Sequence, residues 1–479
     1  MNIRFSFFAA VLLVILLFPA EGFALKRYWR ATAASNWNNT ANWSATAAGA
    51  TGQTVPTTND TAYFTVSGAN GNCTLNAVIT VRRMEIAGYT GTIIHQANAL
   101  TTGATGSTAN DGWVQSSGVF QGGSGSIIMR GNVLISGGDF RSTSATLQLE
   151  RGISLTGTAI FRHNNGLVQC VYGSVNTGSV TWSSTGSPRS FYTLEFNSNN
   201  TKTWTIATNN VLPVVNELKT DGTWLKVVNG GFIDLSGNVN LQGVGAFKGT
   251  TVLRMIGTGN QSITGTVDNG VPHLLPLVIN KATGTVNFIG PVATASSITR
   301  TAGAVNFGTS RFIFTEAGVS PAITGRFTGS NAFHKISVEA STGNMLVAVN
   351  DTVQINDSLH FRASGIRQTA LTKTANGYLR LKGNLVISNT VAGIASQLMY
   401  CFDGTANQRI SGSTTAGCTY LGDVLINKAS GNLDIEGHVV VSGNWQYSTG
   451  SVNAANSTVY LRVMNSTARV VSGSMTFGN

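Results

Sequence analysis

Two nearly identical phrases, LVINKATG at 277–284 and VLINKASG at 424–431, lie 147 positions apart in this chain. Two further blocks repeat at the same offset, namely GTGNQSITG (257–265) with GTANQRISG (404–412) and RTAGAVN (300–306) with YSTGSVN (447–453). Three blocks that keep one spacing without a gap indicate an internal repeat. The repeated blocks are therefore expected to occupy equivalent positions in the fold.

Each block contains a short run in which apolar and polar residues alternate, bounded by Gly, Asn or Ser. A related phrase occurs four more times, as GNVLIS (131–136), GNVNLQ (237–242), GNLVIS (383–388) and GHVVVS (437–442). Alternation of this kind is typical of short strands, and Gly and Asn tolerate the backbone conformations of tight turns. No amphipathic segment longer than about ten residues indicates a helix.

The repeats predict an all-β chain folded as a right-handed parallel β-helix, a solenoid whose coils stack on one another. GNVLISG at 131–137 followed by GISLTG at 152–157 suggests a coil of about 20 residues. Weaker copies of the INKA phrase, at 192–197 and 334–343, lie at unequal distances, which a solenoid tolerates because each coil contacts only its neighbours. Tandem β-sandwich domains show a similar strand spacing and are the alternative.

Residues 1–24 have the pattern of a secretory signal peptide, with Arg4 before an apolar run at 5–18 and small residues at 22 and 24. That run is shorter than the roughly 20 residues of a membrane-spanning helix. We therefore expect a secreted or cell-surface protein whose mature chain has no transmembrane helix.

The mature chain is expected to begin with a Trp-rich capping segment at 25–66, followed by a repeat region at 67–479. The last residues, RVVSGSMTFGN at 469–479, are similar to the block that begins at Gln408. We expect the repeats to continue beyond Asn479, so that this sequence would be the front part of a longer protein.

The capping segment resembles the opening of large secreted bacterial β-helix surface proteins of the autotransporter-like and adhesin-like kind. The matching positions are Trp29, Asn36, Trp37, Asn42, Trp43, Pro56, Asp60 and Phe64. The resemblance implies the β-helix architecture and a surface location. It implies little about activity, because a fold does not fix a function.

Trp29, Trp37 and Trp43 have two interpretations. Exposed indoles stack on sugar rings, so the three could form a glycan-binding face. Alternatively, the segment folds over the first coil, and the indoles close the open end of the core. The second interpretation is favoured, and a Trp37→Ala variant separates the two.

Lys281 and Lys428, in the repeated INKA phrases, could bind a glycan or take part in catalysis. The weaker copies have Ser198 or Ala340 at the equivalent position, although an apolar residue still precedes it. We interpret the phrase as a strand followed by a turn, with the lysine side chain in solvent.

Four cysteines are present, and an even number in an exported chain permits disulfides. Cys401 and Cys418 are close in sequence and form the candidate pair. Buried thiols are an equally good interpretation of Cys73 and Cys170.

The sequence favours a non-enzymatic role, with no cofactor and no metal site. Acidic residues are scattered, and the pairs Asp351 with Asp357 and Asp403 with Asp423 are the best candidates for a two-carboxylate site. The six histidines show no zinc-binding spacing. A polysaccharide lyase or glycoside hydrolase on a β-helix, and a glycan-binding module, remain alternatives.

The net charge of +11 is spread thinly, without the basic run that marks a nucleic-acid arm. A diffuse positive field favours acidic polysaccharide or an anionic cell surface as a partner. The leading hypothesis is a structural or adhesive solenoid that makes many weak contacts along a repetitive face.

Overall fold

The computed structural model describes residues 25–65, 68–103, 111–171, 177–197, 200–266, 271, 273–315, 321–339, 346–347, 351–362, 378–387, 398–412, 420–461 and 470–474. Strands account for 59% of the structure, and these ranges contain no α-helix. Within them, no helix has the length and apolar character needed to cross a membrane. The signal peptide expected at 1–24 lies outside the described residues.

The chain forms a parallel β-solenoid of about 15 coils, as the repeats predict. It divides into two compact units, and unit 1 comprises Met1–Gly166, Gly173–Val175 and Ser183–Arg189. Unit 2 comprises Leu167–Tyr172, Asn176–Trp182 and Ser190–Asn479. The division falls inside the region that the sequence suggests as one continuous array of repeats. Because successive coils pair in parallel, the tandem β-sandwich alternative is wrong.

Unit 1 has three stacks of strands. The first contains, in spatial order, β16 (Ile153–Leu155), β13 (Asn132–Ile135), β10 (Gly112–Gln115), β7 (Arg83–Ile86), β4 (Thr61–Phe64), β1 (Lys26–Trp29) and β3 (Trp43–Ser44). The second contains β17 (Ile160–Arg162), β14 (Asp139–Arg141), β11 (Val119–Gln121), β8 (Thr92–His95), β5 (Cys73–Leu75) and β2 (Ser35–Asn36). The third contains β15 (Thr146–Leu149), β12 (Ile127–Met129), β9 (Leu100–Thr102) and β6 (Ile79–Val81). A 3₁₀ turn, η1, spans Thr40–Asn42.

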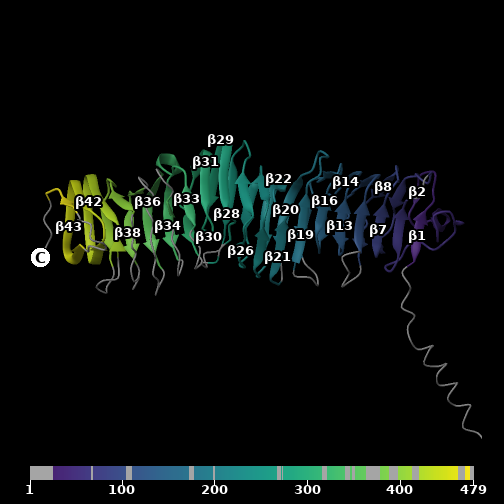
Figure 1. The fold of residues 1–479 in the computed structure, drawn as a ribbon, viewed down its shortest axis with the longest axis horizontal. Coiled ribbons are helices and arrows are strands. Elements are labelled where there is room, and N and C mark those ends of the chain that lie inside the picture. Colours follow the sequence, from purple (N-terminus) through teal and green to yellow (C-terminus); the bar gives the residue numbers. More distant parts are fainter. Residues whose placement is uncertain are drawn as a thin grey trace, which may run out of the picture. The chain divides into compact units, whose positions relative to one another are not determined.

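From β10 to β16 the coils of unit 1 keep a constant length, because Gly112 pairs with Asn132 and Val133 pairs with Ile153. This spacing confirms the coil length expected from the sequence. Stacked strands such as β7, β13 and β16 can be followed in Figure 1. Alternate residues point inward, so the interior holds ladders of like side chains. Phe120 stacks on Phe140 with ring centroids 5.0 Å apart, and such contacts hold each coil on the next.

Unit 2 has longer strands. One stack contains β35 (Leu346–Val347), β33 (Ala322–Thr324), β31 (Ile298–Asn306), β29 (Leu277–Ile289), β27 (Val252–Met255), β24 (Phe232–Leu235), β22 (Val211–Asp221), β20 (Phe191–Asn197) and β18 (Leu167–Cys170), with β25 (Asn238–Leu241) and β28 (Gln261–Gly265) joined to it. Another contains β26 (Phe247–Lys248), β23 (Lys226–Asn229), β21 (Lys202–Ile206) and β19 (Thr177–Trp182). The last stack contains β30 (Val292–Thr294), β32 (Arg311–Phe314), β34 (Phe333–Val338), β36 (Thr352–Phe361), β37 (Tyr378–Leu381), β39 (Met399–Phe402), β42 (Asp423–Val441), β40 (Gln408–Ser411) and β38 (Asn384–Ile387). Three further strands are joined to this stack, namely β41 (Tyr420–Leu421), β43 (Trp445–Leu461) and β44 (Val471–Ser472). A 3₁₀ turn, η2, spans Gly329–Asn331.

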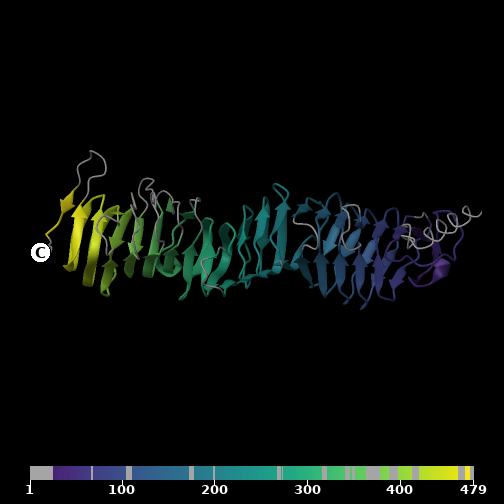
Figure 2. The same ribbon diagram turned by 90° about the horizontal axis from the view of Figure 1, so that it is seen from below.

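Coil length in unit 2 is not constant. Ile233 pairs with Leu253, whereas Val353 pairs with Leu379, so the second of these coils is the longer one. The stacking of strands continues through this longer coil, because β36 pairs in parallel with β37. The neighbouring strands β42 and β43, yellow in Figure 2, show this parallel stacking. Variable coil length explains why the weaker sequence repeats lie at unequal distances.

The capping segment at 25–66 is already part of the solenoid. Its strand β1 pairs in parallel with β4, and β4 pairs in parallel with β7. On its other side β1 pairs with β3 in the antiparallel direction. The short β3 therefore covers the outer edge of β1 with a strand of opposite direction, which is one way to blunt an exposed sheet edge.

Candidate functional site

Lys281, in the first INKA phrase, lies in the interior of unit 2 and is only 1% exposed. Its ammonium Nζ donates to the carbonyl oxygens of Gly257 and Gly259, the latter at 2.9 Å, and to Gln261 Oε1 at 2.6 Å. Gly257 and Gly259 belong to the corner between β27 and β28, and Gln261 is the first residue of β28, one coil earlier. Corner carbonyls have no strand partner, so the ammonium supplies hydrogen bonds that a β-ladder would give elsewhere.

Gln261, in the repeated GTGNQSITG block, connects three coils. Its Oε1 accepts from the N–H of Gly257 at 3.1 Å and from Lys281 Nζ. Its Nε2 donates to the carbonyl oxygens of Leu235, at 3.0 Å, and Gly237, one coil further back. The amide thus uses both donors and accepts twice, which satisfies its capacity in a site that is 2% exposed.

The second copy repeats this arrangement. Lys428 Nζ donates to the carbonyl oxygens of Gly404 (2.7 Å) and Ala406 (2.9 Å) and to Gln408 Oε1 (2.9 Å). Gln408 Nε2 in turn donates to the carbonyl oxygen of Leu381 at 2.8 Å. We call Lys281 and Gln261 with their carbonyls the first lysine cluster, and Lys428 and Gln408 with theirs the second.

The third repeated block supplies the residue that covers each lysine. A Cβ atom on Gly303 would lie 2.7 Å from Lys281 Cβ, and one on Gly450 would lie 2.8 Å from Lys428 Cβ. Both glycines also have positive φ, +92° and +124°, which side-chain-bearing residues rarely adopt. The three sequence blocks are therefore the parts of one buried cluster spread over successive coils.

The interpretation of Lys281 and Lys428 as solvated turn residues is wrong. The strand alternation decides which side chain faces the core: Ile279 and Lys281 point inward, and Asn280 between them is exposed. Burial lowers the pKa of Lys281, and it also lowers that of Lys428, where Asp403 partly opposes the shift. The clusters are structural, and their acceptors leave no open position for a ligand.

The three N-terminal indoles also lie in the interior. Trp29, Trp37 and Trp43 are 0%, 3% and 0% exposed. The ring centroid of Trp43 lies 5.3 Å from that of Trp29 and 4.7 Å from that of Trp37, and all three rings pack near Phe64. Stacking on a sugar requires an exposed ring face, and these rings offer none. Their arrangement is that of a cap over the first coil.

The carboxylates that the sequence suggested as catalytic pairs are all engaged in the fold. Backbone N–H groups donate to Asp351, at 2.6 Å, and to Asp423, at 2.7 Å. Basic side chains pair with Asp357, at 3.3 Å, and Asp403, at 2.8 Å. In the part of the chain that the structure describes, no three or more His, Cys, Asp or Glu residues gather as a metal site.

Cys73, Cys170 and Cys401 are buried free thiols. Burial raises the pKa of Cys170 to about 12, with a contribution from Glu195, and it raises that of Cys401 to about 11. Cys418 lies outside the described residues, so its pairing with Cys401 stays a prediction.

Iodoacetamide at pH 8 is expected to leave Cys73, Cys170 and Cys401 unmodified in the native protein and to alkylate Cys73 and Cys170 in urea, whereas Cys401 reacts in urea only where it is not paired with Cys418. Thiolate is the reactive form, and burial disfavours it and blocks access. Peptide mapping by mass spectrometry gives the extent at each site. Rapid native alkylation of any of the three would contradict the structure. A peptide that joins Cys401 to Cys418 before reduction would confirm the predicted disulfide.

Lys226, in β23, is a buried cation that no sequence pattern singled out. It is 0% exposed, and its Nζ donates to the carbonyl oxygens of Gly222, at 3.2 Å, and Trp224, at 2.9 Å. Burial lowers its pKa to about 8, while Asp221 opposes the shift. The folded chain therefore loses this proton at a lower pH than the unfolded chain does.

A Lys226→Met variant is expected to lose part of the pH dependence of stability. Between pH 8 and 10.5 the unfolded chain holds more protons at this position than the folded chain does. The contribution of Lys226 to the free energy of unfolding therefore grows as pH rises through that window, and this gain is lost as pH falls through 8. The gain from pH 7 to pH 9 is about 1 kcal/mol. Urea unfolding of both proteins at the two pH values measures it. The same pH dependence in both would contradict the assignment.

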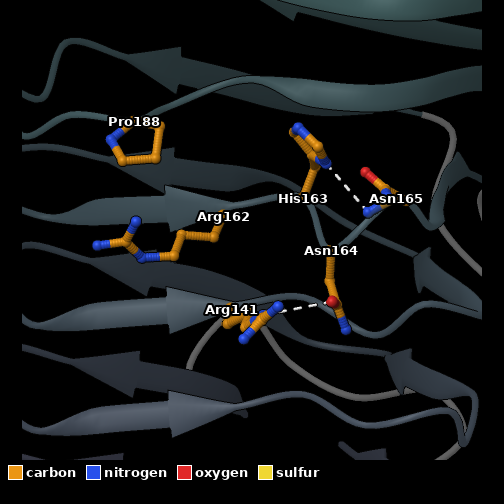
Figure 3. Close-up of a pocket in the computed structure, with 6 residues that line it drawn as sticks. All are labelled: Arg141, Arg162, His163, Asn164, Asn165 and Pro188. Atoms are coloured by element: carbon orange, nitrogen blue, oxygen red, sulfur yellow. Dashed lines mark hydrogen bonds between the residues drawn. The ribbon is translucent and has the colours of Figure 1, made fainter.

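Unit 1 carries an open pocket that the sequence analysis missed. Its volume is 430 Å³, and we call it the arginine pocket after its lining residues, Arg141, Arg162, His163, Asn164, Asn165 and Pro188. Figure 3 shows these side chains on the strand ends and the turn that form it. The phrases DFR at 139–141 and IFR at 160–162, one coil apart, are the sequence signal that marks it.

No known protein family, curated protein or solved structure matches this chain.

Proposed function

We propose that the chain is an exported structural and adhesive β-solenoid of the cell surface, which holds acidic polysaccharide through many weak contacts. The observation that carries the proposal is the register of the outward-facing side chains. In unit 1, Gln121, Arg141 and Arg162 occupy the same position on three successive strands. In unit 2, Arg311 and Lys335 are likewise in register. Stacking thus repeats polar and basic groups along a face.

The division between interior and exterior supports the same role. The most strongly recurring polar residues, Lys281, Gln261 and their copies, serve the interior and hold coil to coil. Outward positions carry varied basic and hydroxyl groups, and the whole chain has a net charge of +11. A positive surface attracts anionic polymers, and linked weak sites gain avidity without any strong single site.

Retention of protein-coated beads under flow tests this function. Beads carrying many copies of the full chain should stay on a polygalacturonate-coated surface and wash from a dextran-coated one. Beads carrying about a hundredfold fewer copies should detach much faster, because avidity depends on the number of linked contacts. Equal loss from both surfaces at high coating would overturn the adhesive role, and so would release of unsaturated or reducing sugars, which would indicate an enzyme.

A further inference from the structure

The two arginines of the arginine pocket owe their position to the core behind them. Phe140 and Phe161 stack inside the solenoid with ring centroids 5.7 Å apart, and the next residue of each strand points outward. Arg141 and Arg162 are therefore adjacent on the outer face of β14 and β17, in register. Parallel strands in contact are about 4.8 Å apart, so two guanidinium groups share one small area.

Each guanidinium is oriented through its Nε atom. Arg141 Nε donates to Asn164 Oδ1 at 3.2 Å, and Arg162 Nε donates to the carboxylate of Asp139 at 2.8 Å. Among the described residues, neither arginine uses its terminal amino groups in a hydrogen bond. Those groups provide a two-pronged donor that suits a carboxylate or sulfate.

A rigid turn forms the floor of the pocket. Asn164 and Asn165 both have left-handed backbone conformations, with φ of 47° and 58°. The N–H of Asn165 donates to His163 Nδ1 at 3.0 Å, and Asn164 Nδ2 donates to the carbonyl oxygen of Gly122 at 3.3 Å. The turn is thereby tied to its own strand and to an earlier coil, and it holds Asn164 where it orients Arg141 (Figure 3).

The charge and size of the pocket restrict its ligand. Asp139 balances one of the two arginines, so one positive charge remains for a ligand. A volume of 430 Å³ exceeds what a lone inorganic anion fills and falls within the range of small-molecule sites. The ring of Pro188 adds an apolar surface, and the Asn164 and Asn165 amides border the opening. An apolar patch, amides and a guanidinium fork together fit a sugar ring that carries an acidic group.

We propose that the arginine pocket binds one residue of an anionic saccharide, with its carboxylate or sulfate on the terminal amino groups of Arg141 and Arg162 and its ring against Pro188. This inference rests on the proposed function and names one of its contacts.

Isothermal titration of the full chain tests the pocket directly. The probes are tetragalacturonate, which carries carboxylates, a heparin tetrasaccharide, which carries sulfates, and neutral maltotetraose. We expect binding of one or both acidic probes and none of maltotetraose. Arg141→Gln/Arg162→Gln should weaken binding at least about 10-fold, because two charge-assisted contacts are lost. Arg141→Gln alone, which leaves Arg162 and its ion pair with Asp139 in place, should weaken it less.

The matched control is Lys219→Gln/Arg409→Gln, which removes two cations whose ion pairs, with Glu195 and Glu436, lie in unit 2. It should bind as the unchanged protein does. Equal weakening by the control would overturn the proposal, as would equal affinity for a single-stranded DNA tetranucleotide, because either result indicates only general attraction of polyanions.

The two assays distinguish the pocket from the adhesive function. If beads adhere but the double variant titrates normally, the proposal for the pocket is wrong and the adhesive function stands. If beads fail to adhere while tetragalacturonate binds and the double variant does not, the pocket stands without the function.

Discussion

Replacing Gln261 by Met is expected to lower the local stability of unit 2 by about 3 kcal/mol. The side chain keeps its length but loses four hydrogen bonds. Lys281 then lacks one of its three acceptors in a buried site, and the N–H of Gly257 is left without its acceptor. An unsatisfied buried polar group costs about 1–3 kcal/mol, and a buried charge costs more.

Hydrogen exchange measured by mass spectrometry is the appropriate readout, because solenoids need not unfold in one step. Peptides that cover 257–265 should exchange about 100-fold faster in the variant. Lys281→Met should cost less, because it removes the buried charge together with its donors. The double variant should cost less than the sum of the two, since the residues share one interaction. Lys335→Met, at an ion pair whose two side chains are 42% and 44% exposed, is the control, with an expected change below about 0.5 kcal/mol. Additive effects would show that the two residues do not act together.

Replacing Trp37 by Ala is expected to destabilise the N-terminal end of unit 1 by about 3–5 kcal/mol, the usual cost of removing a buried indole. The indole packs against Trp43 and Phe64, and the carbonyl oxygen of Trp37 accepts from Trp43 Nε1 at 2.8 Å. Loss of the ring would leave a cavity beneath the first coil. Thermal unfolding followed by tryptophan fluorescence measures the effect.

Trp224→Ala is the matched control for this variant. Trp224 is 52% exposed, so its removal should change stability by less than about 0.5 kcal/mol. Binding of saccharides by Trp37→Ala should remain unchanged at temperatures where the variant is folded. Unchanged melting together with lost saccharide binding would restore the glycan-binding interpretation of the N-terminal tryptophans.

The coil length and the parallel solenoid could be predicted because they depend on patterns that neighbouring residues display. Alternation marks each strand, and the spacing of like phrases marks each coil. The role of Lys281 could not be recovered in the same way, because its partner Gln261 lies one coil earlier and becomes a neighbour only once the coils are stacked. The usual preference of lysine for solvent favoured an exposed side chain. The alternation nevertheless places Lys281 on the same face of the strand as Ile279.

The arginine pocket shows the same limit. Arg141 and Arg162 each follow a core phenylalanine, so their outward direction follows from the strand pattern. Their distance from each other depends on the register between coils. The two arginines share a pocket with Asn164 only because the chain makes a left-handed turn at Asn164 and Asn165. Asn residues permit such a turn but do not require it.

The recurring Lys and Gln residues form buried clusters that join successive coils. Brief acetylation of the native protein with an N-hydroxysuccinimide ester, followed by peptide mapping, tests whether these lysines are buried. Lys281 and Lys428, each 1% exposed, should remain unmodified, while Lys219 and Lys335, whose side chains are 30% and 42% exposed, are acetylated. All four should react in urea. Acetylation of Lys281 and Lys428 in the native protein at the rate of Lys219 would contradict the account.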